Sequence, residues 1–409
     1  MQRLAIDGAF IWDGHADFRS PGRSLLLIED GAIVARFPEG EAPTFGPGTR
    51  VFHYNETATV IPGLIDCHVH ITLDPAIFSA EEQLRVPRER VWAGMQQRAL
   101  AMVQAGITTA RDLGGGAWLE LALRDRITAG EFPGPRLICA GQPITSPEGH
   151  CHFWGGEARG REAVRAVIER QVEHRADWIK VMATGGVFTK GTDVKKAQFD
   201  VEELREIVRC AAQHGRSVAA HCHGAAGIAN AFASGIRTVE HCSFAGSDGF
   251  GEDFDPAKLP SMVRDDVWVS PTVNAGWSRR EEKDGKPTKF WQRMTRCLQG
   301  MHEAGVQLVA STDAGIPGVQ HHQLPEGLQA FQRYAGLSCV ETLRAATSEA
   351  ATALGIAGET GRLEPGLSAD LVVVDGDPTR DLSVLQRPQL VLARGRVAYQ
   401  ADWDQDGSS

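Results

Sequence analysis

Between residues 60 and 360 the chain alternates between apolar runs of strand length and stretches with the spacing of an amphipathic helix. This alternation is typical of βα units around a parallel sheet. Eight strands are expected, and eight parallel strands with intervening helices favour a closed (β/α)8 TIM barrel over an open sheet. No GxGxxG follows the first strand to indicate a dinucleotide site. The expected strands lie within residues 60–71, 107–116, 135–144, 177–186, 216–224, 236–243, 266–273 and 301–315.

The two ends of the chain have a different pattern. Residues 1–60 and 361–409 contain short apolar runs separated by Asp-Gly and Gly-rich turns, without a helical period. Neither end has enough strands to bury a sheet face alone, so we expect both to form one small β-sandwich domain. The prediction is an α/β protein in which a barrel at residues 61–360 separates the two parts of the β domain.

Composition narrows the class of protein. With 409 residues, 42% hydrophobic and 23% charged, the chain is expected to be globular, with one large catalytic domain and an appendage. A net charge of -10 without a basic stripe disfavours nucleic-acid binding. The lack of a signal peptide and of a long apolar run predicts a cytoplasmic protein. The eight cysteines form no CxxC pair, so neither a disulfide framework nor a thiolate zinc site is indicated.

Ionisable side chains stand at or just after the ends of the expected strands. His68 and His70 leave an extended backbone on the same side and can hold one metal ion. Each such residue alone has a structural explanation, such as a salt bridge for Lys180 or a turn cap for Asp313. Together they are costly to bury unless paired or bound to metal, and chemistry gathers at this rim of a barrel. The candidate ligands are His68, His70, Lys180, His221, His241 and Asp313.

The same stretches resemble the amidohydrolase superfamily, in its binuclear branch with a carboxylated lysine, which includes Xaa-Pro dipeptidases; imidazolonepropionase-like amidohydrolases are similar. The matching motifs span nearly the whole chain: GLIDCHVH, IKVMATGGV, VAAHCHG, VEHCS, STDAG and GRLEPGLSADLVVVDGDP. The resemblance implies two divalent metal ions, usually zinc. It implies that His68, His70 and Asp313 hold a buried ion, that His221 and His241 hold a more exposed one, and that Lys180, as N6-carboxylysine, bridges them.

The chemistry of these side chains supports the assignment independently. Imidazole and carboxylate ligands suit zinc better than calcium or magnesium. A lysine is ordinarily an ammonium ion, but burial favours the neutral amine, which can take up carbon dioxide and become a carbamate. Two divalent ions outweigh the negative charges of the carbamate, Asp313 and a bridging hydroxide, so the site stabilises an oxyanion. Asp313 is expected to carry the proton of the hydroxide to the leaving nitrogen.

Further polar residues on the expected loops are candidates for substrate contact. In the similar dipeptidase-like enzymes a Gly-Gly-His motif places its histidine against the substrate, and Glu148-Gly149-His150 keeps that histidine. His223 stands where Xaa-Pro dipeptidases often have a tyrosine, which weakens the inference of a dipeptide substrate. We expect His150 and His223 to act on the substrate. Pocket lining and surface exposure are both open for His152, His321, His322 and Trp277.

The expected reaction is hydrolysis of an amide-type carbon–nitrogen bond by a metal-bridging hydroxide. A dipeptide or N-acyl amino acid ranks first as the substrate, followed by carbamate, urea or aryl amide compounds, because one metal site serves all of them. Cyclic amide hydrolysis or deamination ranks lower, since mononuclear members generally lack the lysine found at position 180. A non-catalytic barrel ranks last, because all six ligands are present. The expected partner is a small-molecule substrate, without nucleic acid or membrane, and homo-oligomerisation is compatible with such a barrel.

Overall fold

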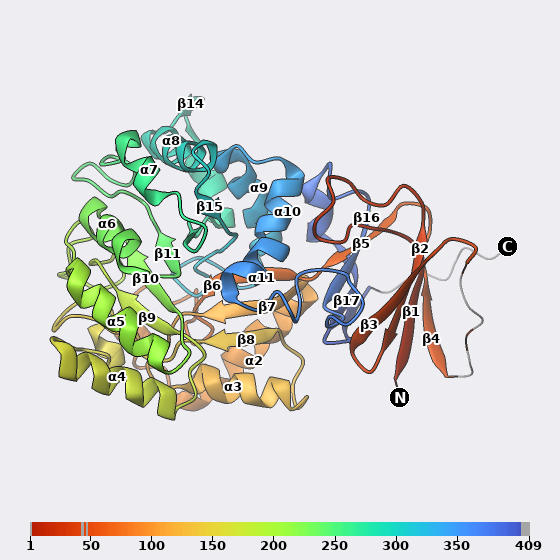
Figure 1. Ribbon diagram of the computed structural model, residues 1–409, viewed down its shortest axis with the longest axis horizontal. Coiled ribbons are helices and arrows are strands. Elements are labelled where there is room, and N and C mark those ends of the chain that lie inside the picture. Colours follow the sequence, from red (N-terminus) through yellow and green to blue (C-terminus); the bar gives the residue numbers. More distant parts are fainter. Residues whose placement is uncertain (1, 42–44, 46–47, 402–409) are drawn as a thin grey trace.

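The computed structural model describes residues 2–41, 45 and 48–401. Figure 1 shows two regions along the long axis of the molecule. In the larger region helices surround central strands, and in the smaller one strands from both ends of the chain lie together. The mixed α/β class predicted from the sequence is confirmed.

The larger region has one strand in each of the eight predicted ranges, counting over the described residues. Pro62 ends the preceding strand, and Gly63 follows without a side chain because a Cβ there would lie 2.0 Å from Thr108 Oγ1. The first strand of the larger region therefore begins at Leu64. The strands are β6 (Leu64–Val69), β7 (Ile107–Asp112), β8 (Arg136–Cys139), β9 (Ile179–Met182), β10 (Val218–Cys222), β11 (Thr238–His241), β12 (Trp268–Ser270) and β15 (Gln307–Leu308).

These strands pair in parallel, so their carboxyl ends share one rim. They form two ladders, β6-β7-β8 and β9-β10-β11-β12-β15. Single bridges join the neighbouring ends of the ladders, one between Ile144 and Val181 and one between Val69 and Ala314. The residues that follow β6 and β15 therefore lie side by side.

Helices connect the strands and lie outside them (Figure 1). Helix α5 shows why the sequence folds this way: Asp200 caps its first turn by accepting a hydrogen bond from the Glu203 amide, and the Glu203 carboxylate accepts one from the Asp200 amide. Its apolar side is buried through Leu204 and Ile207. The helices are α1 (Ala80–Gln83), α2 (Arg88–Gln104), α3 (Leu119–Thr128), α4 (Arg161–Glu173), α5 (Val201–Gln213), α6 (Ala225–Ser234), α7 (Leu259–Met262), α8 (Lys289–Glu303), α9 (Leu324–Ala335), α10 (Cys339–Ala345) and α11 (Ser348–Leu354).

The loops between these elements contain shorter pieces of structure. The 3-10 helix η3 (Ala275–Arg280) and the hairpin of β13 (Glu282–Lys283) and β14 (Lys286–Pro287) precede α8. The other 3-10 helices are η1 (His152–Trp154), η2 (Pro256–Lys258) and η4 (Leu382–Gln386).

The smaller region is one sheet with the order β18-β17-β16-β5-β1-β2-β3, and β4 pairs with β1. Antiparallel pairing of β16 with β5 joins the two ends of the chain, as expected from their similar patterns. The sandwich layering and the domain boundaries near residues 60 and 360 stay predictions. The strands are β1 (Arg3–Ile11), β2 (Ser24–Glu29), β3 (Ala32–Pro38), β4 (Thr49–His53), β5 (Ala58–Pro62), β16 (Leu371–Asp375), β17 (Pro388–Ala393) and β18 (Arg396–Gln400).

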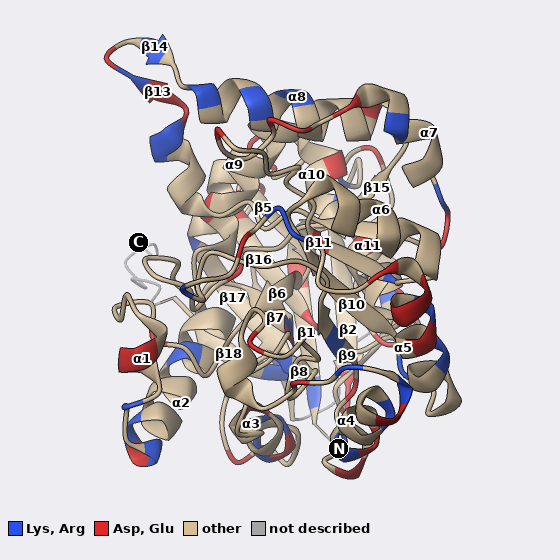
Figure 2. Ribbon diagram, turned by 90° about the vertical axis from the view of Figure 1, so that its left-hand side faces the viewer, with Lys and Arg blue, Asp and Glu red and all other residues tan. Residues whose placement is uncertain are grey.

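Charged residues lie mainly on the outer helices and on the β13–β14 hairpin, whereas the central strands are mostly uncharged (Figure 2). This distribution keeps ions in water and apolar groups in the core. Within the described ranges, no helix combines the length and the apolarity needed to cross a lipid bilayer.

Candidate metal centre

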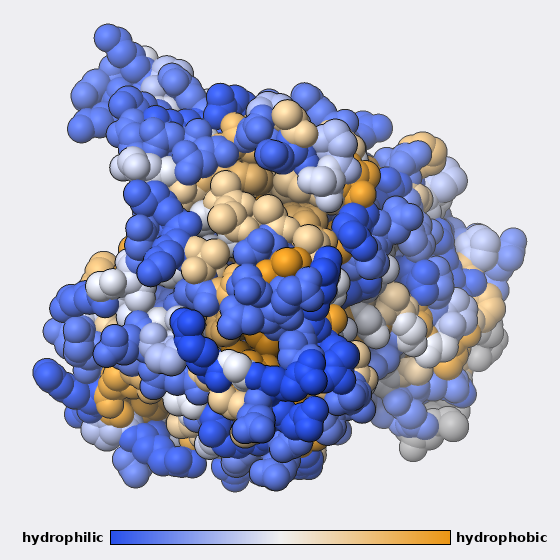
Figure 3. All heavy atoms as spheres, turned by 60° about the vertical axis from the view of Figure 1, so that its left-hand side comes forward, coloured by the Kyte–Doolittle hydropathy of each residue, from blue (hydrophilic) through white to orange (hydrophobic). Residues whose placement is uncertain are grey.

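The six candidate ligands line one cavity of about 560 Å³ at the carboxyl ends of the strands. His68 lies in β6, Lys180 in β9, His221 in β10 and His241 at the end of β11, while His70 and Asp313 follow β6 and β15. Figure 3 shows the face with a hollow whose surface is largely apolar and whose rim is hydrophilic. A cavity of this size and lining suits a small organic ligand.

His68, His70 and Asp313 form a first cluster, with potential ligand atoms within 4.8 Å of one another. The Nε2 atoms of His68 and His70 lie 3.3 and 3.4 Å from Asp313 Oδ1. The Nδ1 atom of His68 is 2.9 Å from Glu240 Oε2, and that of His70 is 2.8 Å from the Gly114 carbonyl oxygen. These outer contacts leave both Nε2 atoms directed to the same point, as in histidines that bind metal.

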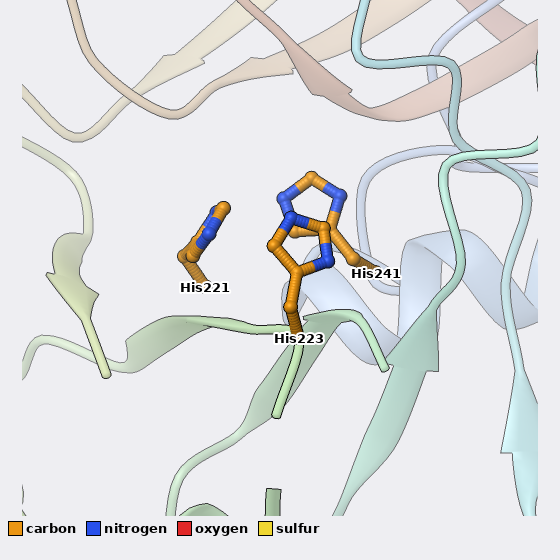
Figure 4. Close-up of side chains that lie close together, drawn as sticks. All are labelled: His221, His223 and His241. Carbon is orange, nitrogen blue, oxygen red and sulfur yellow. The ribbon is translucent and has the colours of Figure 1, made fainter. Parts of the chain in front are cut away.

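His221, His223 and His241 form a second cluster at the carboxyl ends of β10 and β11, shown in Figure 4. The ring centroid of His221 lies 4.5 Å from those of both His223 and His241. His241 Nδ1 is 2.9 Å from Thr272 Oγ1, and His221 Nε2 is 3.2 Å from the Gly185 carbonyl oxygen. Each of these two imidazoles therefore keeps one nitrogen for a ligand.

The backbone is strained in both clusters. His241 and Asp313 have left-handed φ angles of 64° and 61°, which residues other than glycine seldom adopt. Strain of this kind persists where the surrounding fold imposes it, and it is concentrated at functional sites.

Lys180 is buried near both clusters. Its side chain is 1% exposed, and its Nζ has no hydrogen-bond partner in the described part of the chain. Burial lowers the pKa of Lys180 to about 8. The lysine charge acts on His68 of the first cluster and on His241 of the second. A buried amine that lacks a partner is an expensive feature, and it fits a group that is modified to become a ligand.

Three of the four candidate imidazole ligands, those of His68, His221 and His241, are held in the neutral form that binds metal. Burial lowers the pKa of His68 to about 4 and that of His221 and His241 well below the usual value. Burial also opposes the charged form of His70, but its contact with Asp313 outweighs burial and raises the pKa. In the same pair burial would raise the pKa of Asp313, and the two histidines of its cluster reverse that effect. The donor set, imidazoles with an anionic carboxylate, fits divalent ions such as zinc.

A buried ion pair between Arg111 and Glu240 contacts His68 of the first cluster. The guanidinium of Arg111 donates to Glu240 Oε1 at 2.8 Å, to Thr238 Oγ1 at 2.9 Å and to the Cys67 carbonyl oxygen at 2.8 Å. Burial would raise the pKa of Glu240, but Arg111 and His68 hold it below its usual value. Glu240 therefore stays anionic and accepts the Nδ1 proton of His68, which fixes the ring orientation.

The residues expected to contact the substrate have different surroundings. His150 is buried in the cavity wall, 4.6 Å from the His221 ring between centroids, and its Nδ1 has no partner within the described ranges. Burial lowers the pKa of His150 to about 3. His223 also lines the cavity, and its Nδ1 is 2.8 Å from Ser243 Oγ. Burial lowers the pKa of His223 to about 4, so both imidazoles are neutral and partly free for hydrogen bonding.

The structure distinguishes cavity-lining, buried and exposed positions among the four residues whose roles the sequence left open. Trp277 lines the cavity, whereas His152 and His322 do not, and His322 is exposed. His321 is buried, and its Nε2 contacts the His70 carbonyl oxygen at 3.1 Å, so it is neither a pocket residue nor a surface residue. Sequence reasoning missed the cavity-lining Arg279 and Arg280, because their charge run is also the pattern of a solvated loop.

A mixed α/β fold whose strand ends bring histidines, an aspartate and a lysine into one cavity is the arrangement of a hydrolase with a potential metal site. The chain belongs to the Amidohydrolase family, whose model matches residues 59–398. The resemblance to the amidohydrolase superfamily is thereby confirmed, and the chain is a hydrolase of amide-type bonds.

Three relatives illustrate the range of the family. Ochratoxinase of Aspergillus niger is 29% identical over 397 residues, which cover 90% of this chain and 80% of the relative. Imidazolonepropionase of Chloroflexus aggregans is 26% identical over 401 residues, covering 88% of this chain and 87% of the relative. The crystal structure of a Xaa-Pro dipeptidase with bound methionine has a TM-score of 0.84 and 26% identity, covering 98% of this chain and 100% of that structure.

Proposed function

We propose that this chain is a metal-dependent amidohydrolase that cleaves a dipeptide or an N-acyl amino acid. The observation that carries the proposal is the convergence of two histidine-rich clusters and the unpartnered amine of Lys180 on one cavity, within the described residues. Buried groups of this kind need a partner, and two metal ions would satisfy them together.

In this proposal His68, His70 and Asp313 hold one zinc ion, and His221 and His241 hold the other. Lys180 would serve as a further ligand in the form of a carbamate, which forms when the neutral Nζ attacks carbon dioxide and loses a proton. Divalent ions in such a site polarise the scissile carbonyl and lower the pKa of water. The closed barrel that would support the site is favoured by the bridges from Val69 to Ala314 and from Ile144 to Val181.

The side chains of this chain would then move the proton and orient the substrate. Asp313 accepts a proton from the attacking water and gives it to the leaving nitrogen, because its Oδ1 lies at the centre of the first cluster. His150 and His223 are neutral and hydrogen-bond to the substrate through the nitrogens that the protein leaves free.

Carbamate, urea or aryl amide compounds are the second candidate class of substrate. The aromatic side chains of Phe250, Trp277 and Phe290 along the cavity wall favour this class, since an aryl group can pack against aromatic rings.

The decisive experiment measures hydrolysis of dipeptides, N-acyl amino acids and aryl carbamates after chelation and after reconstitution with zinc and bicarbonate. Activity should disappear on chelation and return with about two ions per chain. Asp313→Asn should lose about 100- to 10,000-fold in kcat, whereas Asp284→Asn on the exposed hairpin should keep the parent rate. Hydrolysis that persists in the metal-free chain would contradict the proposal.

A further inference from the structure

The outer wall of the cavity is aromatic. Trp277 of η3 and Phe290 of α8 line it, with ring centroids 4.8 Å apart in an edge-to-face contact. Tyr334 of α9 packs behind them, 4.9 Å from Trp277, and its hydroxyl donates to the Trp277 carbonyl oxygen at 3.2 Å. This packing fixes the wall, so a flat aromatic group can lie against preformed rings.

Two arginines beside this wall form no ion pair with an acidic residue of the described chain. Arg280 lines the cavity, and its guanidinium carbon lies 3.4 Å from the centroid of the Phe290 ring. The neighbouring Glu281 is bound instead by Arg333, at 2.6 Å. Neither Arg280 nor the adjacent cavity-lining Arg279 has an ion pair with any residue that the structure describes. The cation–π contact orients Arg280, and its hydrogen-bond donors are left for another group.

The other charges at the cavity mouth do not neutralise these arginines. Glu81 and Lys190 also line the cavity, but they pair with each other at 3.2 Å. The unpaired charges on the outer wall are therefore both positive, although the protein as a whole has a net charge of -10. A local cationic patch on an acidic protein favours a small anionic ligand over a basic one.

We propose that this wall is a subsite for an aromatic ring bearing a carboxylate, and that Arg280, assisted by Arg279, binds the carboxylate while the ring packs on Trp277 and Phe290. The inference rests on the proposed amide hydrolysis and narrows its substrate to an amide that has both an aromatic ring and a carboxylate on one side of the scissile bond. A cavity of about 560 Å³ has room for such a group in addition to the scissile amide.

The first experiment measures binding without catalysis. The zinc-reconstituted chain is titrated with 3-phenylpropanoate and with 3-phenylpropanamide by calorimetry. The carboxylate should bind about tenfold more tightly than the amide, as expected for a charge-assisted hydrogen bond at a partly exposed site. Arg280→Gln and Arg279→Gln/Arg280→Gln should remove this preference, and Arg280→Lys should keep most of it. Lys286→Gln, the same change of charge on the exposed hairpin, should keep all of it.

The second experiment measures turnover of N-acetylphenylalanine, 4-acetamidobenzoate and 3-(4-acetamidophenyl)propanoate, each beside its carboxamide counterpart. At least one carboxylate should have a KM about tenfold lower than its counterpart, and Arg280→Gln should raise that KM with little change in kcat. Thermal unfolding checks that each variant is folded.

The outcomes separate this inference from the proposed function. An arginine-dependent preference for 3-phenylpropanoate in a chain that hydrolyses none of the amides would support the subsite and contradict the proposed cleavage of N-acyl amino acids. Hydrolysis with no preference for a carboxylate would overturn the subsite. A preference that survives Arg279→Gln/Arg280→Gln would also overturn it, because the metal ions would then bind the anion.

Discussion

Replacement of Lys180 by alanine tests the proposed metal centre most directly. The change removes a side chain that is 1% exposed and whose Nζ has no hydrogen-bond partner in the described structure, so it breaks no visible polar contact. A purely structural lysine of this kind would be replaced with little effect on catalysis, whatever the loss of its buried methylenes costs in stability. A lysine that becomes a bridging ligand would instead be indispensable.

The structure indicates how readily Lys180 can be carboxylated. Burial lowers its pKa from 10.5 to about 8, which raises the neutral fraction at pH 7 from well below 1% to about 10%, roughly two orders of magnitude. Only the neutral amine reacts with carbon dioxide. We therefore expect carboxylation at neutral pH in bicarbonate buffer, detected as the added mass of one carbon dioxide under non-denaturing conditions.

For Lys180→Ala we expect a fall in kcat of more than about 100-fold and a metal content below two ions per chain. Mutation of a residue that only contacts a metal ligand already lowers metal affinity or activity by about 10- to 100-fold, and loss of a bridging ligand should lower activity more. Added formate or acetate should restore part of the activity, since a free carboxylate can take the place of the carbamate. Lys196→Ala, the same change at an exposed position in the following loop, should behave like the parent. Full metal content and full activity in Lys180→Ala would refute the binuclear carbamate centre.

Three further changes test other parts of the structure. Arg111→Met should reduce the free energy of unfolding by about 3–5 kcal/mol in urea titrations, because it removes the guanidinium that balances the charge of buried Glu240, and adding Glu240→Gln should recover part of the loss. Gly186→Ala should lower kcat/KM by up to about 100-fold with little loss of stability, since its Cβ would lie 2.4 Å from His150 Nε2, whereas Gly358→Ala meets no atom and should be silent. Burial raises the pKa of Glu349 to about 7 in the folded chain. Ionisation of Glu349 therefore lowers the free energy of unfolding as the pH rises from about 5 to 8. Glu349→Gln should match the parent near pH 5 and be more stable by up to about 3 kcal/mol at pH 8 in thermal or urea unfolding. An equal effect of Glu349→Gln at both pH values would contradict this reasoning.

Much of this protein could be predicted from local patterns. The alternation of apolar runs and amphipathic helices predicted the α/β class and located the eight strands, because side-chain periodicity depends only on backbone geometry. The candidate ligands could be grouped for a related reason, since residues such as His68 and His241 end parallel strands and such ends meet at one rim. Their roles as ligands stay predictions.

Only the tertiary structure decided what surrounds those residues. The pairing of Glu240 with Arg111 and His68, the burial of His321 against the His70 carbonyl oxygen and the exposure of His322 depend on contacts between segments far apart in the chain. The same holds for Arg280. In the sequence it is part of a charge run of ordinary appearance, and it lines the cavity because the loop packs on α9 through Tyr334 and Arg333. Local pattern determines which face of an element is apolar, but long-range packing determines which neighbours a polar side chain meets.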